Sequence, residues 1–186
     1  MFNVFQRLQN TFNYILTLII AIGVTVSVLG YAQLYLEGYQ TISGNTLVNK
    51  SINTLKYSRN FGGRPNVGKE NIKLNFELDT DLTSLFNWNT KQVFVYLVGE
   101  YAGLEEGENS KVVFWDKIIS DKNDAVLNLS SLKSKYSVWD YQDSLANKTM
   151  NIKLEYNIQP WVGPLIWGSV GSDYIFTAPP VKTANS

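Results

Sequence analysis

Residues 12–36 form an uninterrupted run without a charged side chain. At about 1.5 Å rise per residue, the segment from Ile15 to Leu34 spans ~30 Å as a helix, the thickness of the hydrocarbon core of a bilayer. Its few polar residues are scattered and do not form the polar stripe of a soluble amphipathic helix. Tyrosines lie near both ends, where a ring with one polar tip suits the headgroup region. The pattern predicts one transmembrane helix over residues 12–36.

A cleavable secretory signal is the alternative interpretation of this run, because Gly30-Tyr31-Ala32 has the small-x-small form of a cleavage site. Against cleavage, the run is longer than the roughly 7–15 apolar residues of a typical signal core. Tyr31 and Tyr35 prolong it further. We therefore favour an uncleaved signal anchor.

Charges on either side of the run set the expected orientation. Arg7 is the only charge before it, and the first positive charge after it is Lys50. The positive-inside rule places residues 1–11 in the cytosol as a short tail and residues 37–186 in a lumen. This is a single-pass type II topology.

Beyond the anchor, residues 72–78 and 150–158 alternate between apolar and polar side chains, which predicts half-buried strands. Residues 91–101 are apolar on both faces, which predicts a central strand covered on both sides, with Phe94 and Tyr96 in the core. With no long amphipathic helix after the anchor, the pattern favours an all-β fold, an antiparallel β-sandwich over residues 37–186. We also expect strands at 40–56, 112–119, 124–129 and 172–177, a loop at 59–69, and helical turns at 81–86 and 132–136.

Composition excludes several kinds of chemistry. The chain has neither cysteine nor histidine, which removes thiolate and imidazole catalysis, disulfides and a typical zinc site. Its formal net charge is zero, and no basic stripe appears, so nucleic acid is not an expected partner. We expect no cofactor.

Two short motifs are candidates for a catalytic site or a metal site. Ser130-Ser131-Leu132-Lys133 fits the S-x-x-K pattern of lysine-dependent serine hydrolases, but the S-D-N and K-T-G partners of that chemistry are absent. A chain this rich in serine and lysine is expected to contain such a match by chance. Asp79-Thr80-Asp81 is better explained as a strand end followed by a helix cap than as a metal site. We predict no catalytic and no metal-binding residues.

Asn49, Asn128 and Asn147 each begin an N-x-S/T glycosylation sequon. Their number is what the composition predicts by chance. Asn147 is the strongest candidate, because it lies in a polar stretch just before a predicted strand and its sequon carries threonine.

Residues 160–168 are unusual, because two prolines and two glycines interrupt an otherwise apolar segment. One interpretation is a buried crossover that closes the sandwich. The other is an exposed aromatic surface for a partner or a membrane. In the second case the candidate contact residues are Trp161, Leu165, Ile166 and Trp167.

Four long, ordered motifs carry a resemblance to a known family: residues 85–97, 114–119, 134–136 and 157–163. Through them the chain resembles the signal peptidase complex subunit 3 family, most closely its yeast form. The resemblance covers nearly the whole chain and is weakest in residues 39–69, in the acidic loop after Gly103 and after Gly171.

The resemblance implies a type II glycoprotein of the endoplasmic-reticulum membrane with a lumenal β-sandwich. Members of the family are not the protease. They bind and support the catalytic serine subunit that removes signal peptides from translocated proteins. The expected partners are that subunit, the other small membrane subunits of the complex, and membrane lipid.

Two other functions remain as alternatives. A membrane-anchored lectin-like or adhesive domain would be favoured by clustered exposed aromatic rings beside a calcium site. A hydrolase would be favoured by an exposed, adjacent Ser130–Lys133 pair in a cleft.

Overall fold

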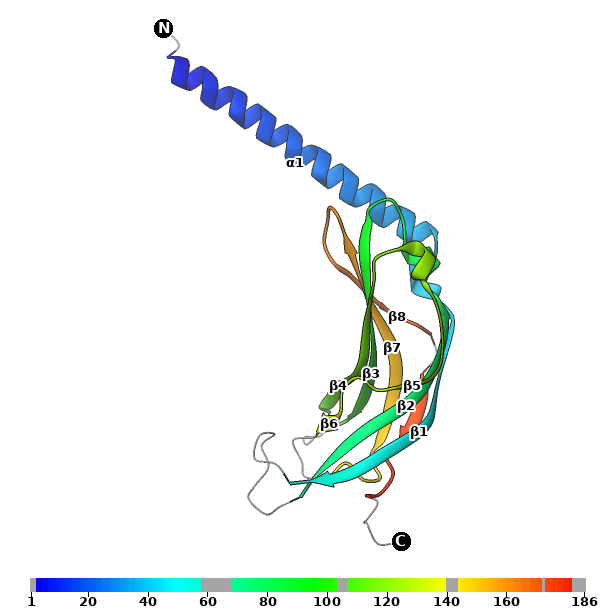
Figure 1. Cartoon of the computed structure of the whole chain (residues 1–186). Helices are drawn as coiled ribbons and strands as arrows, with labels where there is room; N and C mark the ends of the chain where they lie inside the picture. Colours follow the sequence, from blue (N-terminus) through cyan, green and yellow to red (C-terminus); the bar gives the residue numbers. More distant parts are fainter. Residues whose placement is uncertain (1–2, 58–67, 104–106, 140–143, 172, 182–186) are drawn as a thin grey trace.

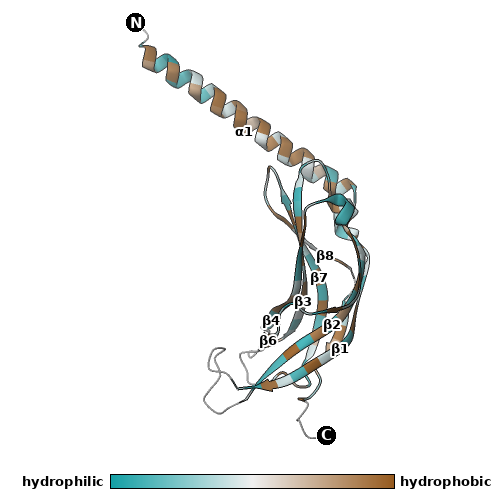
Figure 2. Ribbon diagram, viewed as in Figure 1, coloured by the Kyte–Doolittle hydropathy of each residue, from teal (hydrophilic) through white to brown (hydrophobic). Residues whose placement is uncertain are grey.

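The computed structural model describes residues 3–57, 68–103, 107–139, 144–171 and 173–181. Its first element is a long helix, α1 (Val4–Leu36), which projects away from a β-rich domain (Figure 1). Its end agrees with the end of the uncharged run, but it begins eight residues earlier than Phe12, because the polar segment before that run contains no helix breaker. The helix is long and apolar enough to cross a membrane, and apolar residues dominate its middle (Figure 2).

Three threonines of α1 satisfy their hydroxyls within the helix itself. Thr11, Thr17 and Thr25 each donate to the backbone carbonyl oxygen four residues earlier, at 2.8–2.9 Å. Such bonds remove the penalty of an unpaired hydroxyl in hydrocarbon. The polar residues of the run are therefore compatible with a membrane span.

The domain is a sandwich of two antiparallel sheets. Among the described residues, one sheet has four strands in the order β1-β2-β5, with β6 beside β2. The other has five strands in the order β4-β3-β7-β8, with β9 beside β7. The strands are β1 (Gly44–Lys56), β2 (Lys69–Asp81), β3 (Thr90–Ala102), β4 (Asn109–Ile119), β5 (Val126–Lys133), β6 (Val138–Trp139), β7 (Thr149–Pro160), β8 (Ile166–Ser169) and β9 (Tyr174–Thr177), with 3₁₀ turns η1 (Tyr39–Thr41), η3 (Thr83–Leu85) and η4 (Lys122–Asp124).

The alternating segments of the sequence form the facing surfaces of the two sheets. The predicted inward residues of β2 and β7 are at most 2% exposed, and they are Ile72, Leu74, Phe76, Leu78, Ile152, Leu154, Tyr156 and Ile158. The Tyr156 hydroxyl donates a hydrogen bond to the backbone carbonyl of Tyr39, which ties the start of the domain to its centre. Burial raises the pKa of Tyr156 to about 12, so the ring stays neutral.

The expected edge strand, strand positions and capped turn are largely confirmed. Among the described strands, β1 pairs with β2 alone. Asp81 Oδ1 accepts a hydrogen bond of 2.9 Å from the Thr83 backbone N–H at the start of η3. The loop expected at 59–69 lies mostly outside the described residues, and Lys69 already belongs to β2.

The helical turn expected at 132–136 is wrong. Strand β5 continues to Lys133, where Asn75 of β2 is its cross-strand partner. The strand register shifts between Phe76 and Leu78, and Ser131 adopts a φ of 55° at the same place. This bulge adds a residue and breaks the period of two, which hides the strand from pattern analysis.

Strand β3 is central, as expected, but it is not covered on both faces. Val93, Val95 and Leu97 are fully buried, whereas Phe94 and Tyr96 are only half-buried on the outer face. Their two rings stack with centroids 5.3 Å apart. The prediction that Phe94 and Tyr96 belong to the core is therefore wrong, because no second layer covers this face among the described residues.

A buried carboxylate joins three separate segments at the start of β2. Glu70 is 7% exposed, and its oxygens accept hydrogen bonds from Asn53 and Ser144 and from the backbone N–H groups of Leu145 and Ala146, at 2.6–3.1 Å. Burial alone would raise the pKa of Glu70, but these four donors outweigh it and hold the pKa below its ordinary value.

We expect Glu70→Gln to unfold the full-length chain more easily at pH 7, by about 2–3 kcal/mol, because an amide cannot accept from every donor that surrounds it. The folded-state pKa of Glu70 is depressed, so its stabilisation is present above the unfolded pKa and is lost as pH falls through the folded pKa. The difference between the two proteins should therefore shrink in acid.

Urea unfolding in detergent at several pH values measures this difference. The exposed Glu108→Gln change serves as the matched control and should have little effect. A Glu70→Gln defect of constant size from pH 7 to acid would contradict the assignment.

Candidate interaction surfaces

The apolar stretch at 160–168 forms the tip of the β7–β8 hairpin, which reaches toward α1 (Figure 1). Trp161 is 67% exposed and Trp167 is 62% exposed, and Val162 and Leu165 are also exposed. The interpretation of this stretch as a buried crossover is therefore wrong. It presents large apolar side chains at the surface of the isolated chain.

The structure divides the four candidate contact residues of this stretch into three environments. Trp161 and Leu165 lie exposed at the tip itself, beside the residues Val162 and Gly163 that border a pocket against α1. Ile166 pairs with Ile158 and packs, half-buried, against the core. Trp167 pairs with Asn157 and so lies on the outer face of the five-stranded sheet.

Trp167 is part of a row that crosses this outer face. Cross-strand pairing joins Trp167 of β8 to Asn157 of β7, Asn157 to Phe94 of β3, and Phe94 to Ile118 of β4. We call these four residues the outer-face row. Ile118 is 55% exposed, so the row ends in an exposed apolar side chain at each edge. No pattern in the sequence singles out Ile118, since only the strand register brings it level with Phe94.

The centre of the row contains a polar group that lacks a partner. Asn157 is 5% exposed, and its Nδ2 atom has no hydrogen-bond acceptor within the described part of the chain. Such a buried donor lowers stability, and native structures contain few of them.

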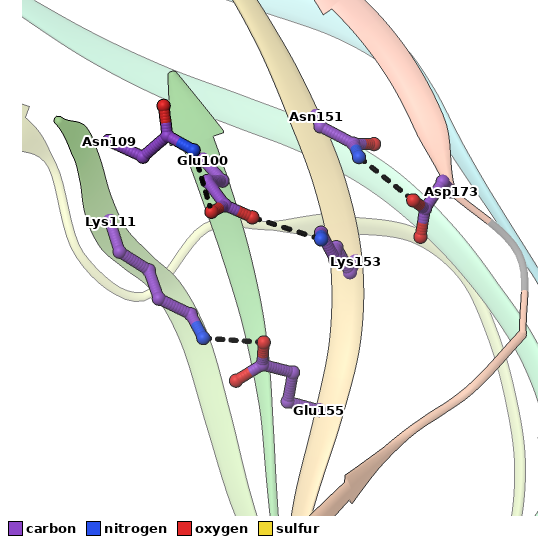
Figure 3. A network of polar contacts seen from close by, with 7 residues as sticks. All are labelled: Glu100, Asn109, Lys111, Asn151, Lys153, Glu155 and Asp173. Atoms are coloured by element: carbon purple, nitrogen blue, oxygen red, sulfur yellow. Dashed lines mark hydrogen bonds and ion pairs between the residues drawn. The ribbon is translucent and has the colours of Figure 1, made fainter. Parts of the chain in front are cut away.

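Farther from α1, the same face carries a network of charged and amide side chains (Figure 3). Lys153 Nζ lies 2.9 Å from Glu100 Oε2, and Asn109 donates to the other oxygen of Glu100 at 3.3 Å. Lys111 Nζ lies 2.5 Å from Glu155 Oε1. A hollow of about 490 Å³ adjoins this network beside β9. The outer face thus combines apolar anchors near α1 with fixed charges beyond them.

The Glu100–Lys153 ion pair of this network remains charged at neutral pH. The hydrogen bond from Lys153 lowers the pKa of Glu100, and the same contact raises the pKa of Lys153. Burial and the neighbouring Glu155 carboxylate raise the pKa of Tyr96 to about 12. None of these shifts moves a pKa toward 7, so the network is suited to binding rather than to proton transfer.

The outer face of the four-stranded sheet is different, because it carries two of the three sequons. Asn49 is exposed on β1, and its Nδ2 atom donates to Glu77 of β2 at 2.6 Å. Asn128 is exposed on β5, opposite Asp79. The third sequon residue, Asn147, is exposed in a turn before β7 with a φ of 61°.

Neither Ser130–Lys133 nor Asp79–Asp81 forms a reactive site. Ser130 and Lys133 are both exposed on β5, and no hydrogen bond joins their side chains. Asp81 caps η3, and Asp79 is exposed opposite Asn128. In the described ranges, no three acidic side chains gather in a way that suits a metal ion.

Comparison with known proteins agrees with the family resemblance. The profile of a family described as "Signal peptidase subunit" matches residues 1–181. The signal peptidase complex subunit 3 of Debaryomyces hansenii is 46% identical over 169 residues, covering 90% of this chain and 89% of that protein. The subunit 3 of Saccharomyces cerevisiae is 43% identical over 178 residues, covering 95% of this chain and 96% of that protein.

The subunit 3 of Yarrowia lipolytica is 40% identical over 167 residues, covering 89% of this chain and 90% of that protein. These matches include both the apolar helix and the β-sandwich, so they concern the whole architecture rather than one motif. With an N-terminal anchor helix, a two-sheet domain and this extent of similarity, the chain belongs to the signal peptidase complex subunit 3 family.

Proposed function

We propose that this chain is a non-catalytic accessory subunit of the signal peptidase complex, which binds and supports the catalytic serine subunit in the endoplasmic-reticulum membrane. α1 anchors it with residues 1–11 in the cytosol, and residues 37–186 form the lumenal domain. Similarity over most of the chain to subunits of that complex supports this assignment.

The outer-face row is the main observation that supports a partner-binding role. Trp167 and Ile118 are more than half exposed at its two edges, on a regular sheet surface that needs no rearrangement to bind. Aromatic side chains that enter a partner's pocket contribute much of the energy of protein interfaces. The charged network beyond the row supplies orientation, since complementary charges fix register more than affinity.

We place the contact with the catalytic subunit on the outer face of the five-stranded sheet, because the outer-face row lies on that face. The outer face of the four-stranded sheet is left open to the lumen.

Calcium-dependent adhesion and hydrolysis are less well supported. Adhesion through calcium requires clustered carboxylates, which the described residues do not provide. Hydrolysis by Ser130 requires a base in hydrogen-bond contact, and Lys133 makes none to it.

Depletion of this chain from cells tests the proposed function. We expect secretory precursors to accumulate with their signal peptides attached. Re-expression of the Ser130→Ala variant should restore cleavage fully, because the serine has no catalytic partner. Normal processing after depletion would overturn the accessory role, and failure of Ser130→Ala to rescue, despite normal protein levels, would overturn the non-catalytic assignment.

We expect Asn147 to carry a glycan, since it lies in an exposed turn, whereas Asn49 and Asn128 lie within strands. Endoglycosidase treatment should increase the gel mobility of the wild-type chain, and Asn147→Gln should reproduce that shift. The matched change Asn128→Gln should have a smaller effect. A chain insensitive to the enzyme would leave the lumenal orientation without support, and an Asn147→Gln variant with wild-type mobility would reject this site.

A further inference from the structure

The β7–β8 hairpin tip contacts α1 inside its uncharged run. A Cβ added at Gly163 would lie 2.5 Å from Ser27 Oγ, and one added at Gly23 would lie 3.9 Å from Val162. Gly163 has a φ of 126°, which favours glycine and allows this close approach. The contact therefore fixes the tip against the side of the helix, well before the helix ends.

The position of Ser27 places the tip at the depth of the membrane. If Ile15–Leu34 spans the hydrocarbon, Ser27 lies ~10 Å inside its boundary, at about 1.5 Å per residue. If the span starts earlier, at Phe12, a segment of the same length ends at Tyr31 and Ser27 is still ~6 Å inside. In either placement, the contact between the tip and Ser27 lies below the boundary of the hydrocarbon.

The tip is chemically suited to that depth. Residues 160–168 contain no charge, and Trp161 and Leu165 are exposed. Backbone polar groups are costly in lipid unless they are paired. Asn89 pairs three of them: its Nδ2 atom donates to the Val162 carbonyl at 2.8 Å, its Oδ1 accepts from the Val162 N–H at 3.1 Å, and its backbone carbonyl accepts from the Trp161 N–H at 2.8 Å.

A second loop contacts α1 about 4.5 Å nearer the end of the helix and is joined to the first. The Asn87 side chain donates to the Gly30 carbonyl of α1 at 2.9 Å, and Asn87 also accepts from the Asn89 N–H at 2.9 Å. Between them, Trp88 is 57% exposed. Both loops are thus held to the helix and to each other.

A lysine lies beside the Trp161 ring. Lys91 Nζ lies 5.3 Å from the centroid of the Trp161 ring, and Lys91 is exposed. A lysine that follows an aromatic ring at the interface can extend its ammonium group toward lipid phosphates. Tryptophan and lysine together are typical of side chains at the headgroup level.

We propose that the tip residues Trp161–Leu165, together with Trp88, insert through the interfacial region into the outer part of the hydrocarbon as a second membrane anchor. The occupant of this apolar surface is phospholipid, because the tip is continuous with the membrane-spanning helix. With α1 as one attachment and the two loops as the other, the domain is fixed in height and tilt above the membrane. The outer-face row is thereby held at a constant distance from the bilayer.

The absence of cysteine from the chain allows a direct test. The full-length Leu165→Cys variant is labelled with an environment-sensitive nitrobenzoxadiazole dye and placed in phosphatidylcholine vesicles, with no other protein present. The matched control is Ile175→Cys on β9, an exposed apolar residue whose strand pairs with the far end of β7. Trp88→Cys provides a second test position.

We expect the labels at positions 165 and 88 to fluoresce several-fold more strongly than the label at 175. Lipids with a nitroxide near the headgroup should quench the first two, and aqueous iodide should quench only the third. Equal iodide quenching at 165 and 175, in variants with unchanged melting temperatures, would overturn the proposal. If Leu165→Cys destabilises the chain, the same comparison between positions 88 and 175 decides the outcome.

Discussion

Replacing Trp167 and Ile118 together by glutamate is expected to lower the affinity of this chain for the catalytic subunit by roughly several hundred-fold or more. Each exposed apolar anchor at an interface can contribute ~2 kcal/mol or more, and about 1.4 kcal/mol corresponds to a tenfold change in affinity. Buried carboxylates in the complex would add a desolvation cost. Pull-down of the catalytic subunit from detergent extracts measures the loss.

The matched control for this variant lies on the opposite face. Leu47 and Val126 are exposed apolar residues of β1 and β5, and their replacement by glutamate changes charge equally. The control variant should retain the catalytic subunit, and both variants should melt like the wild type, since all four side chains are substantially exposed. Equal binding by the two variants would contradict the assignment of the five-stranded sheet as the interface.

Phe76→Ala is expected to destabilise the chain by ~3–5 kcal/mol, a large part of the ~5–15 kcal/mol that a domain typically has. Phe76 is 0% exposed in the middle of β2, and its ring contacts that of Trp115 edge-on, with centroids 5.9 Å apart. Removal of the ring leaves a cavity between the two sheets that the surrounding strands cannot close.

The matched comparison is Phe94→Ala on the outer face of β3. This ring is half-buried and stacks only on its neighbour Tyr96 along the strand, so its loss should cost about 1–2 kcal/mol. Urea unfolding of the full-length variants in detergent measures both effects. Equal destabilisation by the two changes would show that the outer face is covered by a layer that the present fold does not contain.

The parts of the fold that the sequence predicts are those in which local pattern and environment agree. The uncharged run produces α1 because only a helix satisfies its backbone in lipid. The alternating segments around Phe76 and Leu154 form half-buried strands because each has one face toward the core. These features depend on near neighbours in the sequence.

The remaining features depend on which distant segments meet. The pattern of β3 indicates apolar residues on both faces but does not reveal that Phe94 lies on an uncovered face. The outer-face row requires the register of four strands, which no local pattern encodes. The hairpin tip meets Ser27 of α1, which is far away in the sequence, so composition alone left the burial or exposure of the tip open.

The proposal that this chain acts by holding a catalytic partner is tested most directly by purifying the tagged, full-length chain from endoplasmic-reticulum membranes in a mild detergent. We expect a serine protease subunit to elute with it in stoichiometric amounts, together with signal-peptide cleavage activity. The chain expressed and purified alone should cleave no signal peptide. Elution without the protease, or cleavage by the chain alone, would contradict the accessory role.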